Sequence, residues 1–142
     1  MVPPVTPLAD EEYTKLLAFR TGLRQFLRWS EDQAATVGLT PAQHQLLLAV
    51  RGHSGSQAPT VSDVAEHLLL RRHSVVGLVN RAEAAGLLTR LPDARDQRVV
   101  RLQLTKLGKR CLEQLSALHL EELRRLAPSL QPVWEGLDLA AG

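Results

Sequence analysis

Cations and hydrogen-bond donors gather between residues 71 and 98, where this 142-residue chain carries its clearest chemistry. Guanidinium groups pair with phosphates and with guanine edges, and carboxamides pair with adenine edges. Such groups recognise a polyanion and do not by themselves make or break a covalent bond. The candidate contacts are Arg71, Arg72, His73, Ser74, Asn80, Arg81, Arg95 and Arg98.

Charge is distributed unevenly along the chain, although the formal net charge is only +2. Residues 71–110 hold ten Lys and Arg against three acidic residues, a local charge of +7, whereas the rest of the chain carries −5. A focused positive surface is expected where a protein neutralises phosphates. A protein-binding face has no reason to collect ten cations within forty residues. The charge pattern therefore favours double-stranded DNA as the partner, with protein binding as the alternative.

Residues for catalysis do not assemble in the sequence. An enzyme would need a nucleophile with a base, paired carboxylates or a metal cluster, and the chain shows none of these patterns. Its five histidines have no tight ligand spacing. His44 is expected to be packed or to line a pocket rather than to bind a metal. The sequence therefore predicts no enzyme, no catalytic residues, no metal and no cofactor.

The donors are positioned first by a helix predicted over residues 72–85. Its apolar positions recur at helical spacing and form an inward stripe, which leaves a slim outer face rich in donors. The stripe consists of Val75, Leu78, Val79 and Ala82. Gly86 is expected to end this helix, because glycine adopts the left-handed conformation at low cost.

A hairpin is predicted to follow, with strands at 87–91 and 99–104 and a polar tip at 93–98. Pro92 cannot donate to a strand ladder and suits a strand end, and Val100, Leu102 and Leu104 alternate with outward-facing residues. Such a hairpin beside a basic helix forms a wing. The alternative is that the tip is only a solvated turn.

Helices are predicted on both sides of this segment. A long first helix is expected from the acidic turn at residues 10–12 to about Thr36, and its apolar stripe is wide enough to suggest burial by a second copy of the chain. Thr40 and Thr60 are predicted to cap two shorter helices, and Thr105 a last long one. That last helix is expected to reach about Leu126 and to end at Pro128, with a separate short segment after Pro132. The order is helix, turn, helix, wing.

Composition allows one globular core and little more. Hydrophobic content is 44% and aromatic content only 4%, so the core should be mainly Leu, Val and Ala. The bulky anchors are expected to be Phe19, Phe26, Trp29 and Trp134. A single cysteine, Cys111, excludes an internal disulfide and suits a reducing compartment. With no signal-like N-terminus and no apolar run long enough for a membrane span, a cytoplasmic location is expected.

With these motifs assembled, the chain resembles the MarR family of bacterial transcriptional regulators. The similarity covers roughly residues 10–138 and depends on the order and spacing of several pieces. These are LTPAQ at 39–43, VAEHL at 64–68, VNRAEAAGLL at 79–88 and DARDQR at 93–98, followed by Leu104 and Thr105. The implied fold is mainly α with a small β wing. It would form one domain over residues 1–142, with a winged helix-turn-helix lobe at 40–105 and dimerisation helices at 10–36 and 106–138.

The resemblance also implies a homodimer that reads a pseudo-palindromic operator. Many members lose DNA affinity when a small aromatic or phenolic molecule binds between the dimerisation helices and the DNA lobe. The corresponding pocket residues here are Phe19, Leu23, His44 and Leu47. Counted back from Thr105, Arg98 matches the wing arginine that enters the minor groove and Asp96 the acid that supports it, with Arg95 as the competing candidate.

The chain departs from the family pattern at three positions. Arg71 stands where most relatives cap the recognition helix with Ser, which is expected to weaken the cap by ~1 kcal/mol. Gly77 replaces a side chain that often contacts a base. Cys111 lies on an apolar stripe, whereas the oxidant-sensing branch places its cysteine near the start of the first helix. An oxidant sensor acting through Cys111 is therefore a minor alternative to a DNA-binding regulator, with repression favoured over activation.

Overall fold

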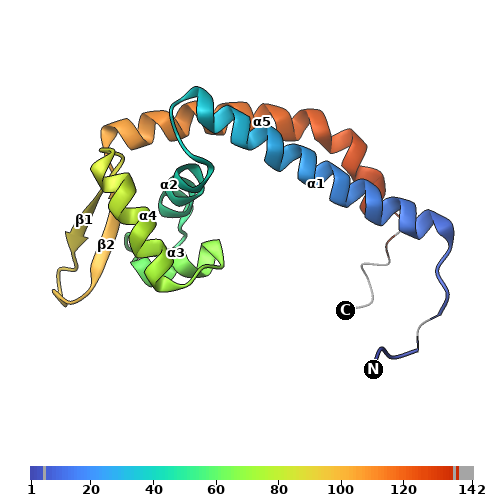
Figure 1. Cartoon of the computed structure of the whole chain (residues 1–142), viewed down its shortest axis with the longest axis horizontal. Coiled ribbons are helices and arrows are strands. Elements are labelled where there is room, and N and C mark those ends of the chain that lie inside the picture. The colour runs from blue at the N-terminus through green and yellow to red at the C-terminus, as the bar shows by residue number, and fades with distance from the viewer. Residues whose placement is uncertain (5, 136, 138–142) are drawn as a thin grey trace. The chain divides into compact units, whose positions relative to one another are not determined.

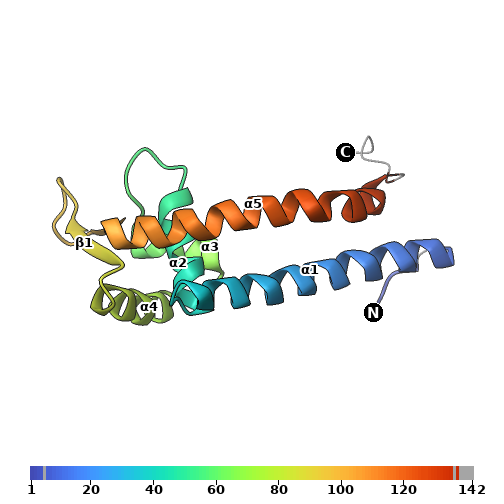
Figure 2. The same cartoon turned by 90° about the horizontal axis from the view of Figure 1, so that it is seen from above.

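The computed structural model describes residues 1–4, 6–135 and 137. The chain forms two compact units, which are described separately. The helical unit consists of Met1–Ser30 and Leu118–Gly142, and the winged unit consists of Glu31–Ala117. Figures 1 and 2 show the elements in chain order. The end of the second dimerisation region implied by the resemblance, residue 138, lies outside the described residues, as does residue 136.

The winged unit has the predicted element order. Its helices are α2 (Pro41–Gly52), α3 (Val61–Leu68) and α4 (Arg72–Ala84), followed by strands β1 (Leu88–Pro92) and β2 (Val100–Leu104). The last residues of α1 (Asp10–Thr36) and the first turns of α5 (Lys106–Trp134) complete it. The two strands pair antiparallel, with Leu88 opposite Leu104 and Pro92 opposite Val100. The predicted fold class, mainly α with a small β wing, is confirmed.

Local sequence signals set most of these boundaries. Thr40 and Thr60 each form a capping box, in which the hydroxyl accepts from the backbone N–H three residues on and that residue's side chain accepts in return. The Thr105 hydroxyl accepts from the N–H of Gly108 at 3.0 Å and so caps α5. Gly86 follows α4 with a φ of 75°, as predicted for a residue that ends a helix.

The buried core of the winged unit is aliphatic. It contains Leu46, Leu47, Val64, Val75, Val79, Leu88, Leu102 and Leu115 as its largest fully buried side chains. The prediction of aromatic anchors was wrong, because all four aromatic side chains lie in the helical unit and none is buried. Leucine and valine supply enough volume on α2, α3, α4 and the hairpin to close the core without them.

Two antiparallel helices make the helical unit, as Figure 2 shows. Ser30 on α1 contacts His119 on α5 at 2.6 Å, and Phe19 packs edge-on against Trp134 at 6.0 Å between ring centroids. At Gly22 the helices approach so closely that an added Cβ would lie 2.9 Å from Leu130. Later residues of α1 thus contact earlier residues of α5, as expected for an antiparallel pair.

Helix α5 continues past the predicted stop at Pro128 and past Pro132, ending at Trp134. The prediction of a break with a separate short segment was wrong. Proline removes one backbone hydrogen bond and crowds the preceding turn, but Leu130 and Trp134 lie against α1 and hold the later turns in place. Tertiary packing therefore outweighs the local proline signal. Among the described residues, no helix is both long and apolar enough to cross a membrane.

Candidate nucleic-acid interface

Helix α4 presents its donors outward by burying the opposite face. Val75, Val79 and Ala82 are fully buried, so the intervening side chains are turned to the surface. Arg71 is the N-cap residue and makes no side-chain capping hydrogen bond, as expected for arginine at this position. The exposed residues of the helix and its cap include Arg71, Arg72, His73, Asn80 and Arg81, while Ser74 is half-buried.

The turn before α4 contains a strained residue that sequence reasoning missed. Leu69 has a φ of 55°, a left-handed conformation that is costly for a residue with a branched side chain. Its backbone N–H and that of Leu70 close the end of α3 by donating to carbonyls of Glu66 and Ala65. The side chain of Leu69 is 91% exposed, so no packing compensates for the strain.

Asp93 organises the tip of the wing. One carboxylate oxygen accepts from the backbone N–H groups of Arg95 and Asp96 at 3.0 Å, and the other accepts from Nε of Arg101 at 2.6 Å. The hydrogen bond from Arg101, followed by those two N–H groups, lowers the pKa of Asp93 from its usual value. The tip is therefore built around an ionised carboxylate, a role that the sequence did not reveal.

Arg101 fastens the wing to the rest of the unit. Its Nη1 donates to the carbonyl of Ala58 at 2.6 Å, and its backbone pairs with Thr60 just before α3. The N–H of Leu102 donates to the carbonyl of Pro59 at 2.8 Å. These contacts join β2 to the loop that precedes α3, so the wing and the helix-turn-helix are held as one body.

Arg98 and Asp96 form a two-point pair at the wing tip. Nε and Nη2 of Arg98 donate to the two carboxylate oxygens of Asp96 at 3.1 and 3.2 Å, and the Arg98 N–H donates to one of them at 3.0 Å. The side-chain hydrogen bonds from Arg98 are the main cause of the lowered pKa of Asp96. The Arg98 side chain is nevertheless 91% exposed, so it remains available to a partner.

Arg90 links β1 to α4 and was not among the predicted residues. Its guanidinium donates to Glu83 Oε1 at 2.6 Å and to the amide oxygen of Asn80. A bidentate contact to adenine needs both the oxygen and the NH₂ of an asparagine side chain. The Asn80 oxygen already accepts from Arg90, so a contact to adenine would use its second lone pair or replace Arg90.

A groove of about 400 Å³ is lined by residues of both α4 and the wing. It lies between the start of α3, the first turns of α4 and the hairpin. Its lining includes Arg72, Arg90 and Arg98, the hydroxyls of Thr60 and Ser62, and no acidic residue. Of the predicted residues, Arg72 and Arg98 meet here, whereas His73, Ser74, Asn80, Arg81 and Arg95 do not line it. A groove lined by guanidinium and hydroxyl groups can hold phosphate oxygens.

The three acids of the basic segment are already engaged with arginines of the same segment. Glu83 pairs with Arg90, Asp93 with Arg101 and Asp96 with Arg98. Across the described residues, the other seven cations of segment 71–110 form no salt bridge with a protein carboxylate. Their positive charge is therefore left for an external anion.

The four predicted pocket residues are divided between the two units. Phe19 and Leu23 are on α1 in the helical unit, where they are 37% and 45% exposed. His44 and Leu47 are on α2 in the winged unit, where both are buried. The pocket itself stays a prediction. Cys111 is half-buried against the core of the winged unit.

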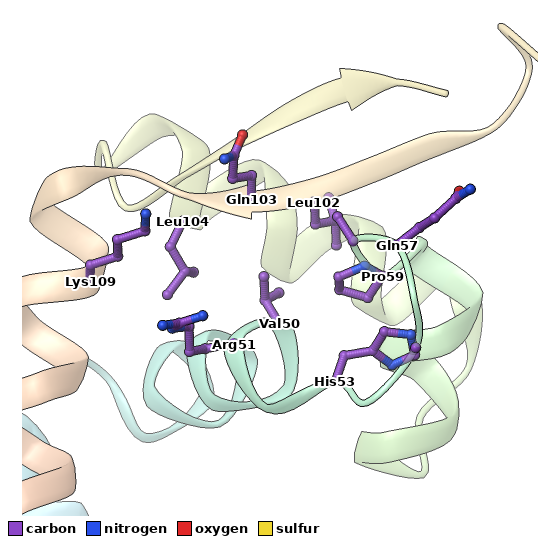
Figure 3. A pocket seen from close by; sticks show the side chains of 11 residues that line it. Val50, Arg51, His53, Gln57, Pro59, Leu102, Gln103, Leu104 and Lys109 are labelled. Carbon is purple, nitrogen blue, oxygen red and sulfur yellow. The ribbon is translucent and has the colours of Figure 1, made fainter. Parts of the chain in front are cut away.

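A second hollow, of about 260 Å³, lies within the winged unit between α2, the following loop and β2. Figure 3 shows Val50, Leu102 and Leu104 between the strand and the helix, with Arg51 and Lys109 at one end and His53 at the other. None of the predicted DNA-binding or pocket residues lines this hollow. Among the described residues, no three His, Cys, Asp or Glu side chains gather in a way that could hold a metal ion.

Residues 37–99 match a family model described as MarR family. The chain is 33% identical over 79 residues to the transcriptional activatory protein BadR of Rhodopseudomonas palustris, which covers 56% of this chain and 45% of that protein. It is 31% identical over 80 residues to the transcriptional repressor MdtR of Bacillus subtilis, covering 56% and 50%. The chain thus matches half or less of the length of these relatives.

The fold is also similar to that of solved structures. The Staphylococcus aureus MepR–DNA complex aligns with a TM-score of 0.68 and 23% identity, covering 79% of this chain and 81% of that one. At this level of identity the likeness concerns the fold alone. The structural similarity agrees with the winged helix-turn-helix formed by α3, α4 and the hairpin.

Proposed function

Because residues 37–99 match a family model described as MarR family, we propose that the protein is a MarR-like, sequence-specific, DNA-binding transcriptional regulator. The observation that carries the proposal is the acid-free groove between α4 and the wing, lined by Arg72, Arg90 and Arg98. Curated relatives include both an activatory protein and a repressor. For this chain we favour repression over activation. We also propose that the protein is cytoplasmic.

The geometry supports a division of labour between the two parts of the interface. Helix α4 enters the major groove, where His73, Ser74, Asn80 and Arg81 read base edges and Arg71 and Arg72 contact the DNA phosphates. The wing reaches the neighbouring minor groove, where Arg98 meets a narrow, strongly negative surface. Arg95, at the same tip, is the competing candidate for this contact.

A homodimer is the proposed functional form. Large apolar side chains remain exposed along both helices of the helical unit, more than a stable monomer ordinarily leaves to water. They include Leu16, Leu17, Leu23 and Leu27 on α1 and Leu118, Leu120 and Leu123 on α5. A second copy of the chain would cover them and would make α1 and α5 the dimerisation region. Two winged units related by a two-fold axis would read a pseudo-palindromic site.

Release by a small aromatic or phenolic effector is part of the proposal. The residues offered for the pocket are Phe19, Leu23, His44 and Leu47. An oxidant response through Cys111 is the alternative, and the half-buried position of this thiol against the core argues against it.

A gel-shift experiment tests the proposal. Duplex DNA flanking the protein's own gene is titrated with the protein, in the presence of excess unrelated duplex, with and without a panel of phenolic compounds. Retarded bands that survive the competitor, and that weaken with one phenol, support regulation of this kind. If no duplex is retained better than the competitor, including duplexes selected from a random pool, the chain is instead a winged-helix module that binds protein. If DNA binds but no phenol changes affinity at millimolar concentration, the effector part is dropped.

A further inference from the structure

Two histidines outside the proposed DNA interface face each other in the winged unit. His53 is the C-cap residue of α2, and His67 lies in the last turn of α3. Nδ1 of His53 is 3.0 Å from Nε2 of His67, and the ring centroids are 5.3 Å apart. The residues are fourteen positions apart, and only the packing of α3 against the end of α2 brings them together. Their spacing in the sequence therefore does not indicate the pair.

The carboxylate of Asp63 lies close to His53. Oδ2 of Asp63 is 3.8 Å from Nε2 of His53, the ring nitrogen that points away from His67. A carboxylate near Nε2 favours the tautomer with its proton on that nitrogen, so that Nδ1 of His53 accepts the hydrogen bond from Nε2–H of His67. Metal binding would replace this hydrogen bond, with the His67 proton moving to Nδ1 of its own ring.

The separation of the two nitrogens suits one shared metal ion. Zinc–imidazole bonds are about 2.0–2.1 Å long, so two such bonds meeting at 90–109° place their nitrogens about 2.9–3.4 Å apart. The observed 3.0 Å falls in this range. In the described part of the chain no third His, Cys, Asp or Glu completes a cluster, so water would fill the remaining positions.

Solvent reaches the pair from two sides. His53 borders the hollow shown in Figure 3, and His67 borders another of about 330 Å³ between α2 and α3. Gly55 lets the loop run against the imidazole, because a Cβ at that position would lie 2.5 Å from Nε2 of His53. An ion therefore has a route to the pair without unfolding of the core.

We propose that His53 and His67 form a two-histidine site for a divalent transition metal, bound through Nδ1 of His53 and Nε2 of His67. Imidazole pairs bind Cu²⁺ more tightly than Ni²⁺ or Zn²⁺. The bound ion ties the loop after α2 to the end of α3 and so stabilises the folded winged unit. Asp63 acts as a positioning residue that orients His53. The site does not depend on the proposed DNA function.

The test uses the tag-free chain, because a polyhistidine tag would bind the same ions. Melting temperature is measured with Cu²⁺, Ni²⁺ and Zn²⁺ and again after EDTA, and the Cu²⁺ protein is examined by electron paramagnetic resonance. We expect one ion per chain, a rise in melting temperature that EDTA reverses, and hyperfine structure from two imidazole nitrogens. Asp63→Asn should weaken metal affinity about tenfold.

Matched variants locate the ion. His53→Ala and His67→Gln should each abolish the metal-induced rise, and their circular dichroism without metal reports whether they fold; His67 is exposed, so its variant is the safer one. His73→Ala and Cys111→Ala should keep the rise, since neither residue belongs to the pair. No rise in the parent with any of the three ions overturns the proposal. A rise that persists in folded His67→Gln, or a copper signal from a single nitrogen, overturns it as well.

Discussion

Two glycines in helices should respond to alanine with opposite signs. Gly108 lies in the first turns of α5 and is buried, and an added Cβ would stand 2.1 Å from the carbonyl oxygen of Leu87. Gly77 lies in the middle of α4, and its Cβ would meet only the Arg81 side chain at an ordinary 3.6 Å. The substitution is the same in both helices, so the difference reports the close approach at Leu87.

The expected magnitudes follow from these distances. At Gly108 the backbone must move by about 1 Å or more, and overpacking of this kind costs about 1–3 kcal/mol. The movement also disturbs the hydrogen bond from the Thr105 N–H to the Leu87 carbonyl, which measures 3.1 Å and contributes about 1 kcal/mol. The higher helix propensity of alanine offsets about 0.5–1 kcal/mol of this. We expect Gly108→Ala to destabilise the fold by about 1–3.5 kcal/mol and Gly77→Ala to stabilise it by about 0.5–1 kcal/mol.

Urea unfolding, followed by circular dichroism at one protein concentration, measures both changes. A shared slope with shifted midpoints would show that only stability has changed. If Gly108→Ala is as stable as the parent, the close packing of α5 on Leu87 is wrong. If Gly77→Ala is destabilised as much as Gly108→Ala, helix propensity and local space do not govern these positions.

Further predictions concern the turn between α3 and α4, the loss of stability at low pH and the proposed dimer. Leu69→Gly should raise the free energy of unfolding by about 0.5–1 kcal/mol, because it removes left-handed strain at an exposed position; a decrease in the same urea assay would show that the leucine side chain has a partner. The folded-state pKa of Asp63 is lowered, so its contribution is present above its usual pKa and is lost as pH falls through the folded value. In Asp63→Asn the free energy of unfolding should therefore fall less steeply below about pH 5 than it does in the parent. If the two proteins lose stability equally with falling pH, other carboxylates cause the loss. Leu23→Glu or Leu118→Glu should reduce soluble, folded protein, and a parent that sediments as a stable folded monomer would remove the dimer.

Local sequence signals predicted the fold because each acts within a few residues. Capping residues such as Thr40, Thr60 and Thr105 satisfy N–H groups three positions ahead, and Gly86 adopts a conformation that its own backbone allows. The buried stripe of α4 follows from helical spacing alone. Caps, helix ends and apolar stripes are each determined within one segment, so they can be predicted without knowing how the segments pack.

Interactions between distant segments could not be predicted in the same way. Arg101 pairs with Asp93 eight residues earlier and with Ala58 forty-three residues earlier, and Arg90 reaches both Glu83 and Asn80. These partners become neighbours only after the hairpin docks. The extension of α5 beyond Pro128 has the same origin, since packing against α1 outweighs a local signal.

The central claim is that the groove between α4 and the wing binds DNA phosphates, and the salt dependence of affinity tests it most directly. Affinity for a selected operator duplex is measured at several salt concentrations for the parent, for Arg98→Ala, for Arg95→Ala and for Arg51→Ala. The last is an exposed arginine of the same unit that does not line the groove. The slope of log affinity against log salt falls by about 0.9 for each phosphate that the protein no longer neutralises.

Arg98→Ala should bind more weakly across operator variants and flatten the slope by the equivalent of about one phosphate per subunit, whereas Arg51→Ala should match the parent. If Arg95→Ala shows that behaviour and Arg98→Ala does not, the wing contact belongs to Arg95. If all three variants bind like the parent at every salt concentration, the wing does not contact DNA and the proposed interface is contradicted.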